Sequence, residues 1–256
     1  MRGIEIDLDG RSALVTGAGR GVGLAIARRL AGAGARVWVN DLDPGRAEEA
    51  ARLVAEGGGD ALPVAADVTD PGSVATMAGV TGPVDILVNN AGVPPVEKSL
   101  TPFSETRRED WAPWTRLNFD AVLDVSHTYV QGMVERGWGR VLTMVSDAGR
   151  KGEAGQVVYG AAKAGAMGFS RGLAVEVGRR GVTVNCIALG ALRHGAVADF
   201  FDANPGVEEK VARAYPLGRL GTPEDPAPLA LLLCSDAGSW ITGQVFVVDG
   251  GFTSGF

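Results

Sequence analysis

The sequence predicts an α/β fold: a doubly wound, seven-stranded parallel sheet with helices on both faces. Short runs rich in β-branched residues alternate with alanine-rich runs of helical character, which is the pattern of such sheets. No internal repeat, low-complexity tract or charge block interrupts this alternation. The strands are expected at residues 13–16, 36–40, 62–65, 85–89, 140–145, 182–187 and 244–248.

Two stretches lack this regularity, residues 93–110 and 193–223. Both follow strand ends, and ligands of doubly wound sheets bind outside the carboxyl ends of the strands. We therefore expect these stretches to be substrate loops. The 256 residues, 46% of them hydrophobic, suffice for one domain spanning residues 1–256.

The composition disfavours several classes of protein. No apolar run approaches the roughly 18 residues of a membrane span. The start of the chain, MRGIEIDLDGRSALVTG, lacks a basic region followed by an apolar one. A formal net charge of −6 disfavours nucleic acid or an anionic membrane as a partner. We expect a cytoplasmic protein that acts on a small-molecule substrate.

The cysteines and histidines do not predict a metal site. Cys186 and Cys234 lie in apolar runs without ligand or redox spacing, so buried thiols are expected. His127 and His194 are far apart and have no cysteine or carboxylate at metal-ligand spacing beside them. Metal catalysis is therefore not expected.

The first predicted strand runs into a glycine-rich turn, TGAGRGVG, and then into a helical run. Glycines let the backbone turn tightly and approach a pyrophosphate, which the free amides of a helix start stabilise. The spacing differs from the common Gly-x-Gly-x-x-Gly, and a glycine turn alone is often structural. Its place between a strand and a helix favours a dinucleotide site. The expected cofactor contacts in this turn are Gly17, Gly19, Arg20, Gly21, Val22 and Gly23.

An acidic residue, Asp41, ends the second predicted strand and is followed by Leu42. A carboxylate at this place can accept hydrogen bonds from an adenosine ribose and repels a 2′-phosphate, which selects NAD over NADP. Arg20 argues for NADP, because an arginine beside the phosphate turn can pair with a 2′-phosphate. We give Asp41 more weight. The alternative is a solvated aspartate that opens a turn before Pro44.

Polar turns follow the third and fourth predicted strands. Asp67 and Val68 could border an adenine edge. Asn90, Ala91 and Gly92 could form a plain turn, because Asn and Gly tolerate left-handed backbone, but they fall at a strand end on the expected cofactor side. All five are predicted cofactor contacts.

The segment SDAGRKGEAGQVVYGAAK can bring a hydroxyl, a phenol and an ammonium to one carbonyl group. Tyr159 and Lys163 are four residues apart in a helical run and therefore share one face. A nearby cation lowers the pKa of a phenol by favouring phenolate. Ser146 ends a predicted strand and could return over the helix start. A Tyr-x-x-x-Lys pair alone often marks only a surface lysine beside a half-buried tyrosine.

Together, TGAGRGVG, Asp41, ADV, NNAG, Asn118, Ser146 and Tyr159-x-x-x-Lys163, with the closing PLGRLGTPED and ITGQVFVVDGG, resemble the short-chain dehydrogenase/reductase family. The resemblance covers nearly the whole chain in the family's order. It implies a Rossmann fold, a homotetramer and a catalytic tetrad. In that tetrad Tyr159 is the acid/base, Ser146 polarises the carbonyl, Lys163 holds the nicotinamide ribose and Asn118 anchors a relay water.

One segment departs from the family. Where the family has Pro-Gly and then a Thr near the nicotinamide amide, this chain has Leu189-Gly190-Ala191-Leu192-Arg193-His194. Gly190 and Leu192, together with Tyr159 and Lys163, are still predicted to contact the cofactor. His194 could replace the hydroxyl, contact substrate or face solvent, and we favour the last interpretation.

The resulting hypothesis is an NAD-dependent oxidoreductase that interconverts a secondary alcohol and a ketone. The apolar lid residues and a resemblance to alicyclic hydroxyacyl-CoA dehydrogenases and 3-oxoacyl-thioester reductases suggest a hydrophobic, cyclic or acyl-thioester substrate. The alternatives are an NADPH-dependent 3-oxoacyl-thioester reductase and a non-catalytic dinucleotide-binding regulator. The predicted substrate contacts are Val93, Ser146, Glu153, Tyr159 and Phe200.

Overall fold

The computed structural model describes residues 6–93, 101–204 and 206–253. Within these residues one sheet has seven strands, all paired in parallel, in the order β3-β2-β1-β4-β5-β6-β7. Each strand overlaps one of the predicted strands, so the doubly wound α/β fold is confirmed. The strands are β1 (Ser12–Val15), β2 (Arg36–Asp41), β3 (Asp60–Ala65), β4 (Ile86–Asn89), β5 (Gly139–Ser146), β6 (Val182–Leu189) and β7 (Val245–Val248).

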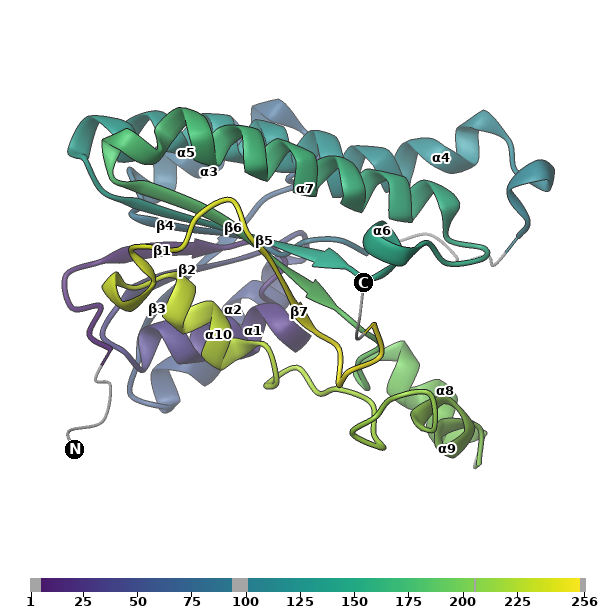
Figure 1. Cartoon of the computed structure of the whole chain (residues 1–256). Helices are drawn as coiled ribbons and strands as arrows, with labels where there is room; N and C mark the ends of the chain where they lie inside the picture. Colours follow the sequence, from purple (N-terminus) through teal and green to yellow (C-terminus); the bar gives the residue numbers. More distant parts are fainter. Residues whose placement is uncertain (1–5, 94–100, 205, 254–256) are drawn as a thin grey trace.

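Helices cover both faces of the sheet (Figure 1). The helices on one face are α3 (Pro71–Thr81), α4 (Arg108–Thr115), α5 (Ala121–Arg136) and α7 (Val157–Val177). Those on the other face are α1 (Gly21–Ala31), α2 (Pro44–Glu56) and α10 (Ala227–Leu233). None of the helices in the described residues has the length and apolar composition that crossing a membrane requires.

Local sequence explains where several of these elements begin. The Asp43 side chain accepts a hydrogen bond from Arg46 N at 3.2 Å and caps α2, and Pro44 opens that helix. Asp70 and Pro71 start α3 in the same way. Strands β4 and β5 lie in the middle of the sheet and are almost wholly buried, as their continuous apolar runs predict.

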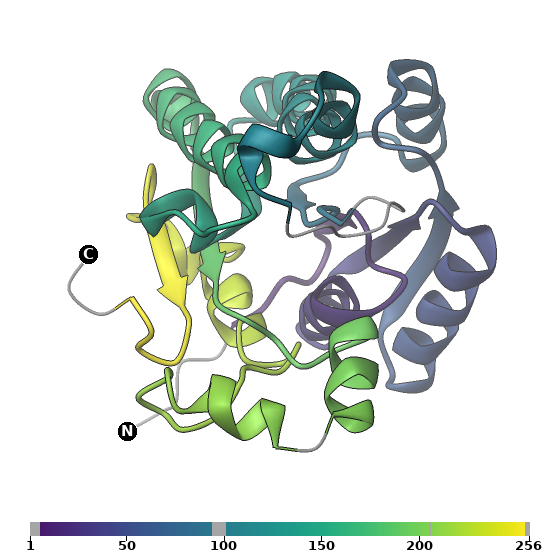
Figure 2. The ribbon, with the colours of Figure 1, turned by 90° about the vertical axis from the view of Figure 1, so that its right-hand side faces the viewer.

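The carboxyl edge of the sheet lies between two groups of short elements. Figure 2 looks onto this edge, with the segment 101–115 on one side and α8 (Ala196–Ala203) and α9 (Val207–Ala212) on the other. The first group contains a 3-10 turn, η1 (Phe103–Glu105), and the start of α4. The predicted loop at 193–223 therefore contains two short helices, whose eight and six residues carry too little periodicity to be seen in the sequence. Part of the other predicted loop, residues 94–100, lies outside the described residues.

Candidate active site

The glycine turn between β1 and α1 has a backbone that only glycine suits. Gly17 and Gly21 have φ values of +60° and +59°, in the left-handed region. A Cβ at Gly17 would lie 2.9 Å from Ala91 Cα, and a Cβ at Gly23 would lie 2.6 Å from Asn90 Nδ2. The turn therefore packs directly against Asn90 and Ala91, which follow β4, and a side chain at Gly17 or Gly23 would push the two segments apart.

Asn90 holds this arrangement together. Its Nδ2 donates to Thr16 O at 2.9 Å and to Gly17 O at 3.0 Å. In return, Thr16 Oγ1 accepts hydrogen bonds from Asn90 N at 3.0 Å and Ala91 N at 3.2 Å. The Asn90 amide is thus a brace for the glycine turn, a role that sequence reasoning did not assign to it.

Asn40, which sequence reasoning did not single out, braces the turn from the other side. It is buried at the end of β2 and donates through Nδ2 to Val64 O at 3.1 Å and Ala66 O at 3.2 Å. Its Oδ1 accepts from Gly17 N at 3.4 Å. The only sequence signal was a polar residue inside an otherwise apolar strand.

Asp41 lies directly against the glycine turn. Its Oδ2 accepts a hydrogen bond from Gly19 N at 3.2 Å, and a Cβ at Gly19 would lie 2.5 Å from the same oxygen. Its Oδ1 accepts from Asp43 N at 3.0 Å and lies 3.5 Å from Arg46 Nε. The carboxylate is buried, whereas Arg20 on the turn is exposed and forms no ion pair among the described residues.

The other predicted cofactor contacts after β2 and β3 differ in exposure. Leu42 is exposed and Val68 is buried. Asp67 Oδ1 accepts from Thr69 N at 2.8 Å and Thr69 Oγ1 at 2.7 Å, so it shapes its own loop.

These residues fit an adenine dinucleotide. The first turn of α1 has no side-chain cap and no acidic residue among the described residues, so its amides are available to an anion. Gly17, Gly19 and Gly21 add no side chains of their own at these amides, and the Asp41 carboxylate borders the same turn.

The catalytic candidates converge beyond the carboxyl end of β5. Ser146 ends that strand, and its Oγ accepts from Ala148 N at 3.2 Å. The Tyr159 phenol projects from the first turn of α7, and its interaction with the Ser146 side chain lowers the phenol's pKa. The Tyr159 ring also makes an edge contact with Trp114 of α4, with ring centroids 5.6 Å apart. Helix α7 confirms that Tyr159 and Lys163 lie in a helical run, as the sequence predicts.

Lys163 lies one turn further along α7 and is 4% exposed. Its Nζ donates to Met144 O at 2.7 Å and lies 5.8 Å from the centroid of the Tyr159 ring. Burial lowers the pKa of Lys163 to about 8.

The pKa of Tyr159 corrects one expectation. Burial raises it, hydrogen bonding to Ser146 lowers it, and the negative charge of Glu153 raises it, with a net rise above 10.0. The predicted net lowering of this pKa is wrong for this structure, because burial of the phenol dominates its pKa and burial also disfavours the charged form of Lys163.

Asn118 lies where the helix that contains it changes its winding. Residues Arg116–Asp120 form a π-helical segment, η2, between α4 and α5, a distortion that often occurs at functional sites. Asn118 is 0% exposed, and its Nδ2 donates to Trp114 O at 3.0 Å. Its Oδ1 has no hydrogen-bond partner among the described residues. A Cβ at Gly92 would lie 3.0 Å from Lys163 Nζ and 3.1 Å from Asn118 Oδ1, so Gly92 leaves room for both groups.

Sequence reasoning missed a pair of carboxyl groups beside Ser146. Asp147 is 3% exposed, and neither of its carboxyl oxygens accepts a hydrogen bond from an N–H or O–H group of the described residues. Burial and the neighbouring Asp249 carboxylate raise the pKa of Asp147 to about 6. Asp249 follows β7 and accepts hydrogen bonds from Gly251 N, Thr253 N and Thr253 Oγ1. A protonated Asp147 can donate to Asp249.

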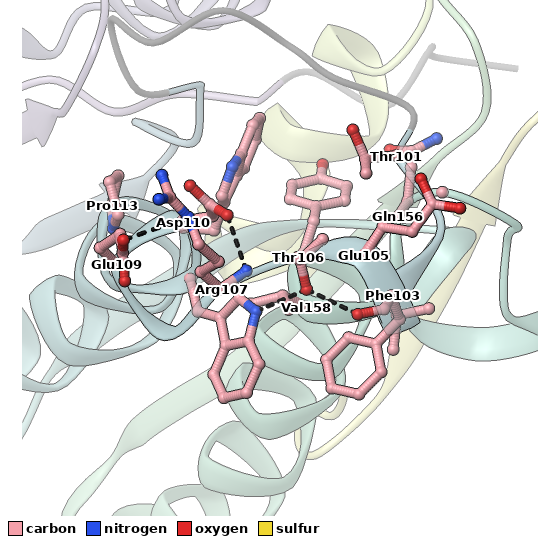
Figure 3. A pocket seen from close by; sticks show the side chains of 15 residues that line it. Thr101, Phe103, Glu105, Thr106, Arg107, Glu109, Asp110, Pro113, Gln156 and Val158 are labelled. Atoms are coloured by element: carbon pink, nitrogen blue, oxygen red, sulfur yellow. Dashed lines mark hydrogen bonds and ion pairs between the residues drawn. The ribbon is translucent and has the colours of Figure 1, made fainter.

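A cavity of about 500 Å³ opens beside Tyr159, between α4 and the start of α7 (Figure 3). Thr106 accepts a hydrogen bond from Trp111 Nε1 at 2.8 Å, and Phe103 stacks on Trp111 with ring centroids 5.3 Å apart. Glu105, Glu109, Asp110 and Arg107 give the lining more negative than positive charge. The residues that line the cavity are Thr101, Phe103, Glu105, Thr106, Arg107, Glu109, Asp110, Trp111, Pro113, Trp114, Gly155, Gln156, Val157, Val158 and Tyr159.

Of the predicted substrate contacts, this cavity includes only Tyr159. Val93 is 74% exposed, Glu153 is exposed, and Phe200 on α8 packs against Phe201. Sequence reasoning missed Phe103, Trp111 and Trp114, although the aromatic pair in DWAPWT was a visible signal.

The segment after β6 corrects a second expectation. Leu192 is buried and pairs with Gly221 in an isolated bridge, and Gly190 packs against Asp249 and Tyr215. His194 faces solvent only in part, because its imidazole is half-buried against Gly21. Within the described part of the chain, no group of three or more His, Cys, Asp or Glu side chains could hold a metal ion.

Comparisons with known proteins agree with this geometry. A family model described as enoyl-(acyl carrier protein) reductase matches residues 17–253. The 3-oxoacyl-[acyl-carrier-protein] reductase FabG of Aquifex aeolicus (strain VF5) is 34% identical over 97% of this chain and 99% of its own length.

Two solved structures superpose on nearly the whole chain. A gluconate 5-dehydrogenase from Burkholderia cenocepacia, in complex with NADP and tartrate, has a TM-score of 0.88 and 30% identity over 98% of both chains. A 7α-hydroxysteroid dehydrogenase, complexed with NADH and 7-oxo glycochenodeoxycholic acid, has a TM-score of 0.89 and 34% identity over 98% of both chains. This chain therefore belongs to the short-chain dehydrogenase/reductase family and is an oxidoreductase that acts on CH–OH groups.

Proposed function

We propose that this protein is an NAD-dependent oxidoreductase that interconverts a secondary alcohol and a ketone with a hydrophobic, cyclic body. The observation that carries the proposal is the buried Asp41 carboxylate on the glycine turn, in a chain that also brings Ser146, Tyr159 and Lys163 together.

The catalytic roles follow from these contacts. A nicotinamide dinucleotide held at the glycine turn would supply the hydride chemistry, and the residues of this chain would position the substrate and move the proton. Tyr159 donates its phenol proton to the ketone oxygen in reduction and accepts the alcohol proton in oxidation. Ser146 holds the same substrate oxygen. The raised pKa of Tyr159 keeps the phenol protonated at neutral pH, which favours reduction there and oxidation at alkaline pH.

Lys163 and Asn118 support this proton transfer. Lys163 is oriented by Met144 O, and its pKa of about 8 makes it a proton donor or acceptor close to neutral pH. Asn118 Oδ1, which has no hydrogen-bond partner among the described residues, lies beside Gly92, as the Lys163 amine does, and can accept a hydrogen bond from a relay water.

The preference for NAD rests on electrostatics at Asp41. A 2′-phosphate on the adenosine ribose would bring a second negative charge to this buried carboxylate, which is costly at low dielectric. Three structural neighbours hold NADP and the hydroxysteroid dehydrogenase holds NADH, so the relatives favour NADP and the preference for NAD depends on Asp41.

The cofactor preference is tested by Asp41→Asn. This variant keeps an acceptor but removes the charge, so the ratio of kcat/KM for NAD to that for NADP should fall about 10-fold or more. The matched control is Asp43→Asn, which removes a neighbouring exposed charge and keeps a helix cap. It should leave the ratio unchanged. An unmodified enzyme that prefers NADP would overturn this part of the proposal.

A second candidate is an NADPH-dependent 3-oxoacyl-thioester reductase. The family description and the FabG relative favour it, as does the exposed Arg20 beside the turn. The net charge of −6 and the acidic residues of the cavity disfavour this candidate, because an acyl thioester on a negatively charged carrier protein or coenzyme would be repelled.

The cavity beside Tyr159 supports a hydrophobic, cyclic substrate. Its rings come from Phe103, Trp111 and Trp114, and about 500 Å³ is enough for a fused-ring or long apolar substituent. The hydroxysteroid dehydrogenase shows such a substrate on a neighbouring member of the family.

Turnover assays separate the candidates. Alicyclic and steroid secondary alcohols would be offered with NAD and NADP at alkaline pH, and 3-oxoacyl thioesters with NADH and NADPH at neutral pH. We expect NAD-linked oxidation of ring alcohols. Turnover confined to 3-oxoacyl thioesters with NADPH would establish the second candidate instead.

We further propose that the enzyme assembles as a homotetramer through α7. Small and apolar residues on α7 are exposed in the single chain, namely Ala161, Ala164, Gly168, Gly172 and Val175. Such a stripe suits close packing of a helix against a second copy.

Gly168→Glu tests this assembly. A Cβ at Gly168 meets nothing within 4 Å, and Glu forms helix better than Gly, so the single chain should tolerate it. The charge would be buried between copies, so the mass in sedimentation should fall. Gly79→Glu on α3 is the matched control, because Gly79 is also exposed and open. A Gly168→Glu variant of undiminished mass contradicts the interface.

A further inference from the structure

His194 lies at the joint between β6 and the short helix α8, next to the glycine turn. A Cβ at Gly21 would lie 3.2 Å from its Nδ1 and 3.5 Å from its Cε1, so the imidazole is in contact with the turn. The His194 carbonyl accepts a hydrogen bond from Val197 N at 3.2 Å, in the first turn of α8. His194 thus connects the glycine turn to the segment that carries α8 and α9, here called the lid.

The electrostatic surroundings of His194 are unfavourable for a cation. Burial lowers its pKa below the ordinary value, and the positive charge of Arg20 lowers it further. Among the described residues, Arg20 is the charged side chain whose electrostatic repulsion changes the His194 pKa. The neighbouring Arg193 is occupied by ion pairs to Glu208 and Asp202 on the lid helices. At pH 7 the imidazole is therefore neutral, with one N–H to donate.

An anion at the start of α1 would change this balance. The amides there lack a side-chain cap, and Gly21 presents no side chain between them and His194. A pyrophosphate on these amides would place its negative charge against both His194 and Arg20. Its charge would offset the repulsion from Arg20 and favour the protonated imidazole.

We propose that His194 is a cofactor-binding residue, whose imidazole donates a hydrogen bond to the dinucleotide pyrophosphate from across the glycine turn. The inference rests on the dinucleotide site of the proposed function. It assigns His194 a role that the departure from the family sequence left open. Because the same residue begins the lid segment, cofactor binding would also hold α8 toward the site.

Proton uptake by His194 gives the proposal a signature that packing alone would not produce. If the imidazole is neutral in the ligand-free protein and protonated against pyrophosphate, affinity for NADH must fall as pH rises through the His194 pKa of the complex. The dissociation constant should rise by up to about 10-fold between pH 6 and pH 8, because a His194 pKa rise of about one unit on binding limits the total change to that factor.

The chain has only two histidines, which makes a direct test practicable. His127 is exposed on α5, away from the glycine turn, and His127→Gln leaves His194 as the single imidazole. NMR titration of this variant would follow the His194 ring proton alone, with NADH, with ADP-ribose and with AMP. We expect a pKa below 6.5 in the ligand-free protein and a rise of about one unit or more with the two pyrophosphate ligands. AMP, which lacks the pyrophosphate, should raise the His194 pKa by a smaller amount.

Two variants at His194 complete the test, with their dissociation constants for NADH measured by calorimetry. His194→Ala and His194→Gln should bind NADH about 10-fold more weakly at pH 6, with a much smaller deficit at pH 8, because a charge-assisted hydrogen bond is lost. Tight NADH binding with an unmoved His194 pKa would overturn the inference and leave the proposed function intact. If neither NADH nor NADPH binds, both fall together.

Discussion

The cofactor side and the substrate side of this active site are built by different means. On the cofactor side, the side-chain amides of Asn40 and Asn90 hydrogen-bond the backbone of the glycine turn, and Thr16 Oγ1 accepts hydrogen bonds from the backbone just after β4. On the substrate side, the cavity beside Tyr159 is lined by side chains of η1, α4 and α7, and many of them are exposed. Short motifs with fixed backbone geometry therefore specify the first side, and the meeting of separate helices specifies the second.

Tyr159 stands between the two sides, so removing its hydroxyl gives the largest expected effect. Tyr159→Phe should lower kcat/KM for the alcohol about 10³-fold or more, because the proton donor and acceptor is lost. NADH binding should remain within about threefold, since none of the glycine-turn contacts involves the phenol. Steady-state kinetics and calorimetry measure the two effects separately. Retained turnover would refute the catalytic role, and lost NADH binding would mean that the two sides are not independent.

The second-largest expected effect is on the stability of the fold and concerns Asp147, which follows Ser146 at the carboxyl end of β5. Its pKa is raised from 3.8 to about 6 by burial and by Asp249. A carboxyl group whose folded pKa is raised destabilises the fold increasingly from pH 4 to pH 6 and fully above that range. The shift corresponds to about 3 kcal/mol. Asp147→Asn should therefore be more stable than the parent at pH 8 by up to that amount, with a smaller gain at pH 5.

Urea unfolding at pH 5 and pH 8 measures this difference. Asp225→Asn is the control, because its expected effect on stability has the opposite sign. Hydrogen bonding to Arg219 lowers the pKa of Asp225 to about 2. Its carboxylate is ionised at both pH values, so its loss should be destabilising to the same degree at each. An Asp147→Asn gain that does not change with pH would show that the carboxyl groups do not share a proton.

The same contrast explains what the sequence could predict. The sheet, the helix at Val157–Val177 and the glycine turn follow from local patterns, because strand periodicity, helix propensity and positive-φ glycines act within a few residues. The Asp147 and Asp249 pair could not be found in this way, since about a hundred residues separate its members. They come together only because the ends of β5 and β7 lie on either side of β6 at the same edge of the sheet. The pKa of Tyr159 was misjudged for a related reason, because burial and the hydrogen bond of Lys163 to Met144 depend on packing.

The smallest expected effect tests the substrate side alone. Trp114 meets Tyr159 edge to face and lines the cavity, whereas its backbone oxygen, not its ring, holds Asn118. Trp114→Leu therefore keeps the Asn118 contact and removes part of the aromatic wall. KM for a ring alcohol should rise about 10-fold, as expected from losing an aromatic contact, while KM for NAD stays unchanged. The matched control is Trp240→Leu, because Trp240 is 99% exposed after α10 and should change neither constant. Equal rises in both KM values for Trp114→Leu would mean that the cavity is not a separate substrate site, and the division between the two sides would have to be drawn elsewhere.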